Sequence, residues 1–201
     1  MMNETAALHR LLDVALAVAA ERRTEPVLRT VLDAARDLAG ARYAAIGVPD
    51  GDGGFATFLT VGIDSETWDR IGTLPRTHGL LGAVLRDGAP IRLDDLRQDP
   101  RYGGWWPKAH PRMTAFLGVP IITGGEILAE LYLADKAAES GGTTFTDTDQ
   151  RYVETLAGQA ALALVNAQRH ERARELSVAA ERTRLARDLH DSLTQTLFSL
   201  T

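Results

Sequence analysis

The stretch FLGVPIITGGEILAELYLADK, residues 116–136, decides the fold of this chain. Two apolar runs, Thr114–Ile122 and Glu126–Asp135, flank the turn sequence TGG at 123–125. Paired glycines accept the positive φ angles that a tight turn between antiparallel strands requires, so this spacing predicts a β-hairpin. We therefore expect an antiparallel sheet built around these two strands.

The chain that follows the hairpin predicts one long helix. Thr146 is a suitable N-cap with Asp149 three residues later, and Gly158 is the single glycine or proline over 146–201. A helix over this range would measure about 84 Å at 1.5 Å per residue. A small domain cannot bury that length. We therefore expect the helix to project and to pair with a second copy of the chain, giving a homodimer.

The chain before the hairpin supplies further helices and strands. Apolar residues recur every three or four positions in two segments, which predicts amphipathic helices over 4–21 and 24–38. Short apolar runs bounded by turn residues then replace this pattern. They predict strands over 43–48, 55–61 and 90–93 and short helices over 65–71 and 79–86. The irregular stretch 94–112 is long enough to indicate a functional loop.

Together these elements predict an α+β fold. We expect a sensor-sized domain over 1–168, a coiled-coil connector over 169–180, and the start of a dimerisation helix over 181–201. A thin apolar seam with 3-4-3 spacing runs along the connector and beyond, formed by Ala173, Leu176, Ala180 and Thr183. Because so weak a seam allows more than one packing arrangement, we expect a signal to pass along it as a rotation, tilt or register shift.

Composition excludes several classes of protein. The 201 residues are 45% hydrophobic and 24% charged, which is typical of a globular chain. The absence of cysteine excludes disulfides, thiolate metal sites, iron–sulfur clusters and thioether-linked cofactors. A net charge of -5 argues against direct nucleic-acid binding. No apolar run approaches the length of a membrane span, so we expect no membrane contact and a cytoplasmic location.

The segment ERTRLARDLHDSLTQTL, residues 181–197, carries a candidate reactive histidine, His190. On a helix, its leucines fall on one face, His190 lies at the rim of that face, and Asp191 and Gln195 lie together on the polar side. A rigidly held, neutral imidazole is a good nucleophile, and a neighbouring carboxylate can accept its proton. From spacing alone, a solvent-exposed histidine on a coiled coil is the alternative.

This segment resembles the H-box of two-component sensor histidine kinases whose partner response regulators are of the NarL type, with the pattern E-R-x-R-I-A-R-E-L-H-D-x-x-x-Q-x-L. The resemblance implies that His190 is the phosphoacceptor and Asp191 the base for autophosphorylation. Asp191 and Gln195 would form the pair that dephosphorylates the response regulator. ATP would act through a catalytic domain that these 201 residues do not contain. We therefore expect this chain to be part of a longer kinase and inactive alone.

The earlier part of the chain resembles a GAF domain, on the segments FLGVPI (116–121), ILAELYLADK (127–136) and FTDTDQRYVETLAGQAALAL (145–164). Within that family it is similar to the haem-binding GAF domain of actinobacterial DosS/DosT-type sensor kinases. The segments that carry this likeness are ARYAAIGV (41–48), GLLGAVLRDGAPIRLDDL (79–96), HPRMTAFLGVP (110–120) and LYL (131–133). The resemblance implies haem b with His110 as proximal iron ligand, and Tyr132 on the distal side, hydrogen-bonded to a diatomic gas.

The residue chemistry is compatible with that expectation. His110 precedes Pro111, which favours an extended segment entering the following strand. A neutral imidazole is a good iron ligand, and a phenol can donate to bound oxygen. Apolar residues could form the walls of a haem pocket: Phe58, Leu59, Ile71, Leu80, Leu81, Met113, Phe116, Leu117, Ile127, Leu131 and Leu133.

Several alternatives stay open. The named sensors carry two GAF domains in tandem, whereas one precedes the H-box here, and Trp105 and Trp106 could fill the pocket. His78 is a rival ligand. Four residues resemble the N-K-F-D-E signature of cyclic-nucleotide GAF domains, with aspartate in place of asparagine: Asp135, Lys136, Phe145 and Asp149. The domain could thus bind another small molecule or a nucleotide, serve as a ligand-free dimerisation module, or belong to a non-kinase protein.

Overall fold

The computed structural model describes residues 4–72, 75–103 and 109–198, with side chains described up to residue 187. Trp105 and Trp106 lie outside the described residues. Five α-helices and two short 3-10 helices are present in the described part: α1 Glu4–Ala20, α2 Thr24–Ala39, α3 Ser65–Ile71, α4 Gly79–Asp87, α5 Asp147–Phe198, η1 Leu96–Gln98 and η2 Ala138–Ser140. The strands are β1 Ala41–Pro49, β2 Phe55–Val61, β3 Ile91–Leu93, β4 Phe116–Thr123 and β5 Glu126–Lys136.

The five strands form one antiparallel sheet in the order β2-β1-β5-β4-β3. The predicted central hairpin is confirmed as β4 and β5, with Thr123 paired to Glu126. Gly124 and Gly125 adopt φ angles of 56° and 83°, as a two-residue hairpin turn of the favoured type requires. The predicted α+β class is confirmed by this sheet and the helices around it.

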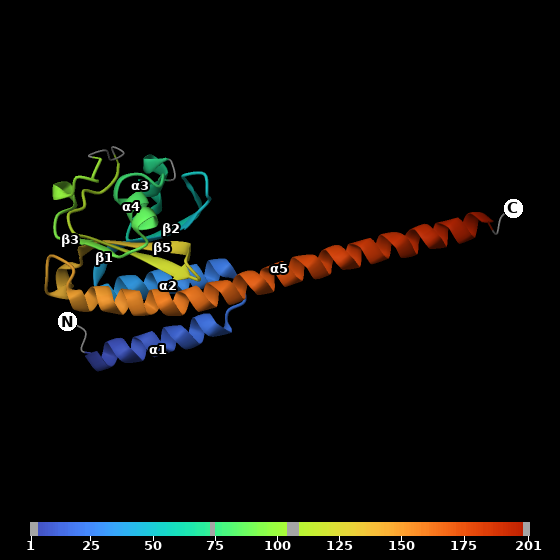
Figure 1. Ribbon diagram of the computed structural model, residues 1–201, viewed down its shortest axis with the longest axis horizontal. Helices are drawn as coiled ribbons and strands as arrows, with labels where there is room; N and C mark the ends of the chain where they lie inside the picture. The colour runs from blue at the N-terminus through green and yellow to red at the C-terminus, as the bar shows by residue number, and fades with distance from the viewer. Residues whose placement is uncertain (1–3, 73–74, 104–108, 199–201) are drawn as a thin grey trace.

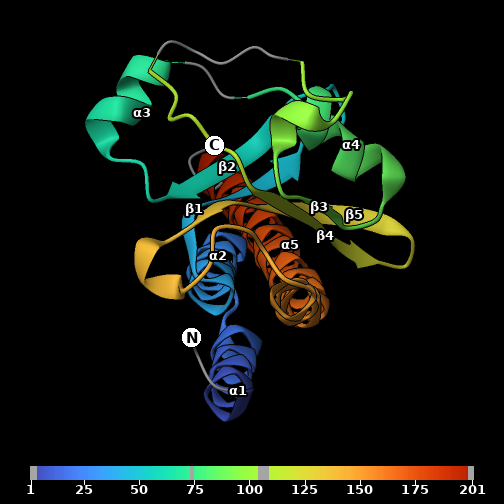
Figure 2. The ribbon, with the colours of Figure 1, turned by 90° about the vertical axis from the view of Figure 1, so that its left-hand side faces the viewer.

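Helices cover both faces of the sheet (Figures 1 and 2). α2 and α5 lie directly against one face, and α1 packs on the outside of these two helices. α3, α4 and the connecting loops lie over the other face. Because neighbouring residues of a strand point to opposite faces, the four longer strands contribute to two separate cores, whereas β3 contributes to one.

The two cores differ in size and chemistry. The helix-side core joins α1, α2 and α5 to the sheet through aliphatic residues such as Ile46, Leu131 and Leu133. The smaller core, which we name the α4-side cluster, is rich in aromatic residues. Its buried members are Phe55, Leu80, Ala83, Val84, Ile91, Leu96, Phe116 and Tyr132.

α5 leaves the domain as an unbroken helix of 52 residues, which corresponds to about 78 Å (Figure 1). The predicted N-cap is confirmed: the backbone N–H of Asp149 donates to Thr146 Oγ1 at 3.2 Å, and the backbone N–H of Thr146 donates to Asp149 Oδ2 at 2.7 Å. Residues 172–187 are exposed. No described helix combines the length and the apolar character that a bilayer crossing requires.

Candidate functional site

The structure gathers most of the predicted haem contacts on one face of the sheet. Phe116 and Tyr132 are buried members of the α4-side cluster, and Met113 packs against it. Leu117 is fully buried in the helix-side core, because it follows Phe116 on the same strand and points the opposite way. Leu117 therefore does not face the side on which Tyr132 lies. The same holds for three of the predicted pocket walls, Leu59, Leu131 and Leu133.

His110 lies half-buried just before β4, and its Nδ1 is 2.8 Å from the carbonyl oxygen of Pro111. Since a carbonyl oxygen can only accept, Nδ1 carries the proton and the ring lone pair lies on Nε2. Burial lowers the pKa of His110, and the hydrogen bond to Pro111 acts in the opposite direction. The imidazole is thus neutral at pH 7, as a metal ligand requires.

Tyr132 is hydrogen-bonded to Glu130, a residue that was not among the predicted site residues. The Tyr132 hydroxyl donates to Glu130 Oε2 and lies 3.5 Å from the carbonyl oxygen of Leu81 on α4. Glu130 is 0% exposed, and its other oxygen, Oε1, has no hydrogen-bond partner among the described residues. The signal for this pair was present in the sequence: residues two apart on a strand share a face, so Glu130 must accompany Tyr132.

Burial is the largest cause of the pKa shifts of Glu130 and Tyr132. It raises the pKa of Glu130 to about 7, and the hydrogen bond from Tyr132 offsets part of that effect. Burial also raises the pKa of Tyr132, and the negative charge of Glu130 adds to the rise. Near neutral pH, Tyr132 is therefore protonated while Glu130 is poised between its acid and its carboxylate.

Aromatic rings surround Tyr132, the hydrogen-bond donor to Glu130. The ring centroids of Phe55, Phe58 and Phe116 lie 6.3, 6.4 and 6.3 Å from that of Tyr132. Trp68 of α3 stacks on Phe58, with a centroid distance of 6.2 Å and an interplanar angle of 7°. Three aromatic rings thus pack around the Tyr132 ring, and Trp68 covers one of them.

Two glycines make this close packing possible. Gly47 and Gly118 lie opposite Glu130 and Tyr132 on the neighbouring strands β1 and β4. A Cβ atom on Gly47 would lie 2.5 Å from the Phe55 ring, and one on Gly118 would lie 2.6 Å from Val84 Cγ2. Side chains at these positions would push Phe55 and α4 away from the sheet.

The surroundings of Tyr132 do not fit a haem. Phenylalanine rings already pack against the Tyr132 ring, so a macrocycle would have to displace them. The phenol proton is donated to Glu130 rather than directed at a space where a gas could bind. A buried carboxylate, Glu130, also lies beside Tyr132, where a haem pocket would need an apolar wall. The protonation state of His110 suits an iron ligand, but the surroundings of Tyr132, its expected distal partner, leave no room for the haem.

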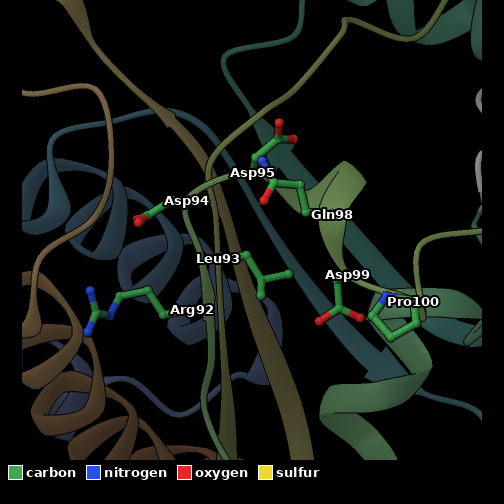
Figure 3. A pocket seen from close by; sticks show the side chains of 7 residues that line it. All are labelled: Arg92, Leu93, Asp94, Asp95, Gln98, Asp99 and Pro100. Carbon is green, nitrogen blue, oxygen red and sulfur yellow. The ribbon is translucent and has the colours of Figure 1, made fainter.

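A polar groove of about 440 Å³ lies elsewhere, along the β3 edge of the sheet (Figure 3). It is lined by Arg92, Leu93, Asp94, Asp95, Gln98, Asp99 and Pro100. Asp95 and Asp99 already pair with Arg97 and Arg101 at 2.7 and 2.8 Å, and Arg97 lowers the pKa of Asp95 to about 2. These carboxylates are therefore ionised, and the two arginines balance their charges. This arrangement favours a structural role in shaping the loop.

The residues that resemble the cyclic-nucleotide signature form a structural junction. Lys136 Nζ lies 2.8 Å from Asp149 Oδ2 and 5.6 Å from the centroid of the Phe145 ring. Asp135 accepts hydrogen bonds from the backbone N–H groups of Thr114 and Ala115. These contacts join β5 to the start of α5 and to the loop before β4. His78, the rival ligand, directly precedes α4.

The predicted phosphotransfer residues lie far from the sheet. The backbone of α5 is helical at His190, Asp191 and Gln195, and their side chains lie outside the described part. Glu171 of α5 still contacts the domain: its carboxylate accepts from the Thr24 backbone N–H at 3.0 Å and from Thr24 Oγ1 at 2.6 Å. One continuous helix thus connects the sheet to the H-box.

A family model described as GAF domain matches residues 21–165. The chain belongs to the GAF domain family. A second model, described as histidine kinase, matches residues 181–201, the segment that contains His190. The GAF domain is followed in the same chain by a histidine kinase segment, as the sequence predicted.

Solved structures show the same fold. The GAF domain of a phosphoenolpyruvate-protein phosphotransferase from Coxiella burnetii has a TM-score of 0.69 and 24% identity, covering 83% of this chain and 96% of its own. A free methionine-R-sulfoxide reductase from Neisseria meningitidis has a TM-score of 0.62 and 15% identity, covering 82% and 92%. The GAF-B domain of DevS from Mycobacterium smegmatis has a TM-score of 0.56 and 23% identity, covering 74% and 98%.

Proposed function

We propose that this chain is the sensor portion of a dimeric two-component histidine kinase. The state of the α4-side cluster in the GAF domain controls phosphorylation of His190 and phosphotransfer to a response regulator of the NarL type. The observation that carries this proposal is the continuity of α5, which packs on the sheet at one end and contains the H-box at the other. The match of residues 181–201 to the histidine kinase model supports it.

The sheet offers a direct route from the cluster to α5. On β5, Glu130 and Tyr132 face the α4-side cluster, whereas Leu131 and Leu133 face the helix-side core. The same strand ends at Lys136, which pairs with Asp149 in the first turns of α5. A shift of β5 caused by a change around Glu130 would therefore move the base of α5. Two paired helices can respond by rotation or register shift, since packed helices have discrete arrangements.

At the far end, the resemblance assigns the chemistry. A ring nitrogen of His190 attacks the γ-phosphorus of ATP held by a catalytic domain, ADP leaves, and the proton lost by the ring passes to Asp191. Gln195, one helical turn from Asp191, would orient the water that later hydrolyses the phosphorylated response regulator.

Phosphotransfer can be tested by supplying a catalytic domain of the same kinase type together with radiolabelled ATP. We expect acid-labile label on the wild-type chain and none on His190→Gln. His170→Gln is the matched control, because His170 is an exposed histidine on the same helix. Equal label on the His190→Gln and wild-type chains would refute the assignment.

Haem on His110 stays a prediction, supported by the neutral state of the imidazole. An absorption spectrum of protein expressed with haem available tests it. A Soret band that disappears in His110→Ala would establish the ligand, and would show that the cluster around Tyr132 opens to admit a macrocycle. A spectrum without a Soret band would leave a different small molecule as the occupant of the domain.

A further inference from the structure

We propose that the α4-side cluster binds a small organic cation, a primary ammonium or amidinium, with Glu130 as its anionic partner and aromatic rings as its walls. This inference rests on the proposed sensor function and names the class of ligand that the GAF domain would detect.

The first argument is the unfulfilled hydrogen-bonding capacity of Glu130. Its side chain is fully buried, Oε2 accepts from Tyr132, and Oε1 has no partner among the described residues. A buried carboxylate without a full set of donors is costly, and folded proteins rarely keep one without a function. An ammonium or amidinium group would donate to Oε1 and would also balance the charge.

The second argument is that no arginine or lysine in the described part of the chain pairs with Glu130. The one basic residue of β5, Lys136, is already paired with Asp149 and also donates to the carbonyl oxygen of Ala39. Burial and the Tyr132 hydroxyl account for the pKa of Glu130, with no contribution from a described arginine or lysine. Among the described residues, therefore, no side chain supplies the cation of an ion pair at Glu130.

The third argument is the aromatic character of the walls. Phe55, Phe58 and Phe116 surround Tyr132, and Phe55 lies 5.1 Å from Phe58 between ring centroids. The faces of aromatic rings attract organic cations, and the attraction increases when the cation is desolvated. The same surroundings disfavour an anion, because Glu130 would repel it and no described cation would compensate.

For a cation to reach Glu130, the elements that cover the cluster must move. Of these elements, α3 is the one held by the fewest buried contacts. None of its seven residues is buried, and it contacts the cluster through Trp68 stacked on Phe58. Displacing α3 would expose the Phe58 side of the cluster at little cost in buried apolar area. Binding would then be reported by the fluorescence of Trp68 and by the position of β5.

The test uses matched small probes on the full chain at pH 8, where Glu130 is largely ionised. Benzylammonium and benzamidinium are the cations, benzyl alcohol is the neutral analogue, and benzoate is the anion. Isothermal titration should show that the cations bind the wild-type chain and bind Glu130→Gln about tenfold more weakly or worse. Benzyl alcohol should bind both chains equally, and benzoate should bind neither.

Two further variants separate recognition from folding. Glu126→Gln alters an exposed acid on the same strand and should leave cation binding unchanged. Tyr132→Phe keeps the ring and removes the donor to Glu130, so it should retain cation binding. For the wild-type chain, cation affinity should fall as the pH is lowered from 8 to 6, because protonation removes the charge of Glu130.

Equal binding of the cations to the wild-type chain and Glu130→Gln would overturn the inference. So would a preference for benzoate, or no cation binding to the wild-type chain up to about 10 mM. The phosphorylation assay on His190 is independent of these titrations. Label on His190 without cation binding would reject the ligand class and leave the sensor-kinase proposal intact.

Discussion

Lys136 and Asp149 form a buried ion pair where β5 meets α5, with Nζ 2.8 Å from Oδ2 and side-chain exposures of 8% and 12%. Lys136 also donates to the carbonyl oxygen of Ala39 at the end of α2. Asp149 also closes the capping box with Thr146. One ion pair thus connects the central hairpin, a helix of the core and the base of the helix that leaves the domain.

Replacing Lys136 by methionine should lower the free energy of unfolding by about 3–5 kcal/mol, because Asp149 would stay buried without its partner. Arg29→Met is the control, since Arg29 pairs with Glu25 on the surface and each side chain is 63% exposed. The control should change stability by about 0–1 kcal/mol. Urea denaturation measures both values. Losses of equal size would show that the junction contributes no more than a surface pair.

Glu130 should make stability depend on pH. The folded chain holds the Glu130 proton up to about pH 7, whereas the unfolded chain releases it near the ordinary value of 4.5. Stability should therefore fall as pH rises from 4.5 to 7 and level off above 7, by about 3 kcal/mol at most.

Glu130→Gln isolates this contribution, because glutamine does not titrate but can still accept from Tyr132. Denaturation of both chains at pH 5 and pH 8 gives the comparison. The wild-type chain should lose more stability than the variant between these two pH values. Parallel changes in the two chains would mean that the folded state does not raise the pKa of Glu130.

The sequence was sufficient to predict the secondary structure but not the faces of the strands. Turn glycines and apolar periodicity are local signals, so the β4–β5 hairpin and the cap at Thr146 were predicted correctly. Leu117 and Phe116 are both apolar neighbours on a strand buried on both faces, so no polar alternation indicated which one faces α4. Glu130 was missed because an isolated acid in a strand usually marks a solvated face, whereas this side chain is 0% exposed.

Glu171 should stabilise the domain from outside its predicted boundary at residue 168. Its carboxylate accepts two hydrogen bonds from Thr24 and so acts as a cap for α2, where the N-cap residue Arg23 makes no side-chain hydrogen bond of this kind. Glu171→Ala should cost about 1–2 kcal/mol, the usual effect of removing a cap. Glu175→Ala, one turn further along the exposed part of α5, should cost almost nothing. Similar melting temperatures for the two variants would show that the contact with Thr24 is not stabilising.

Cysteine scanning along α5 should reveal how two copies of the chain pair. The chain contains no cysteine, so each introduced thiol reports on its own position. The predicted seam includes Leu176, whereas Val178 lies about 200° around the helix from it, and both are exposed in the single chain, by 66% and 46%. Under mild oxidation, Leu176→Cys should form a disulfide-linked dimer much faster than Val178→Cys, because the bridge requires Cα atoms within about 7 Å. Ala180→Cys, the next seam position, should also react. Equal rates at 176 and 178 would mean that the two helices do not pack along the predicted seam. A signal would then have to pass from Glu130 to His190 by another path.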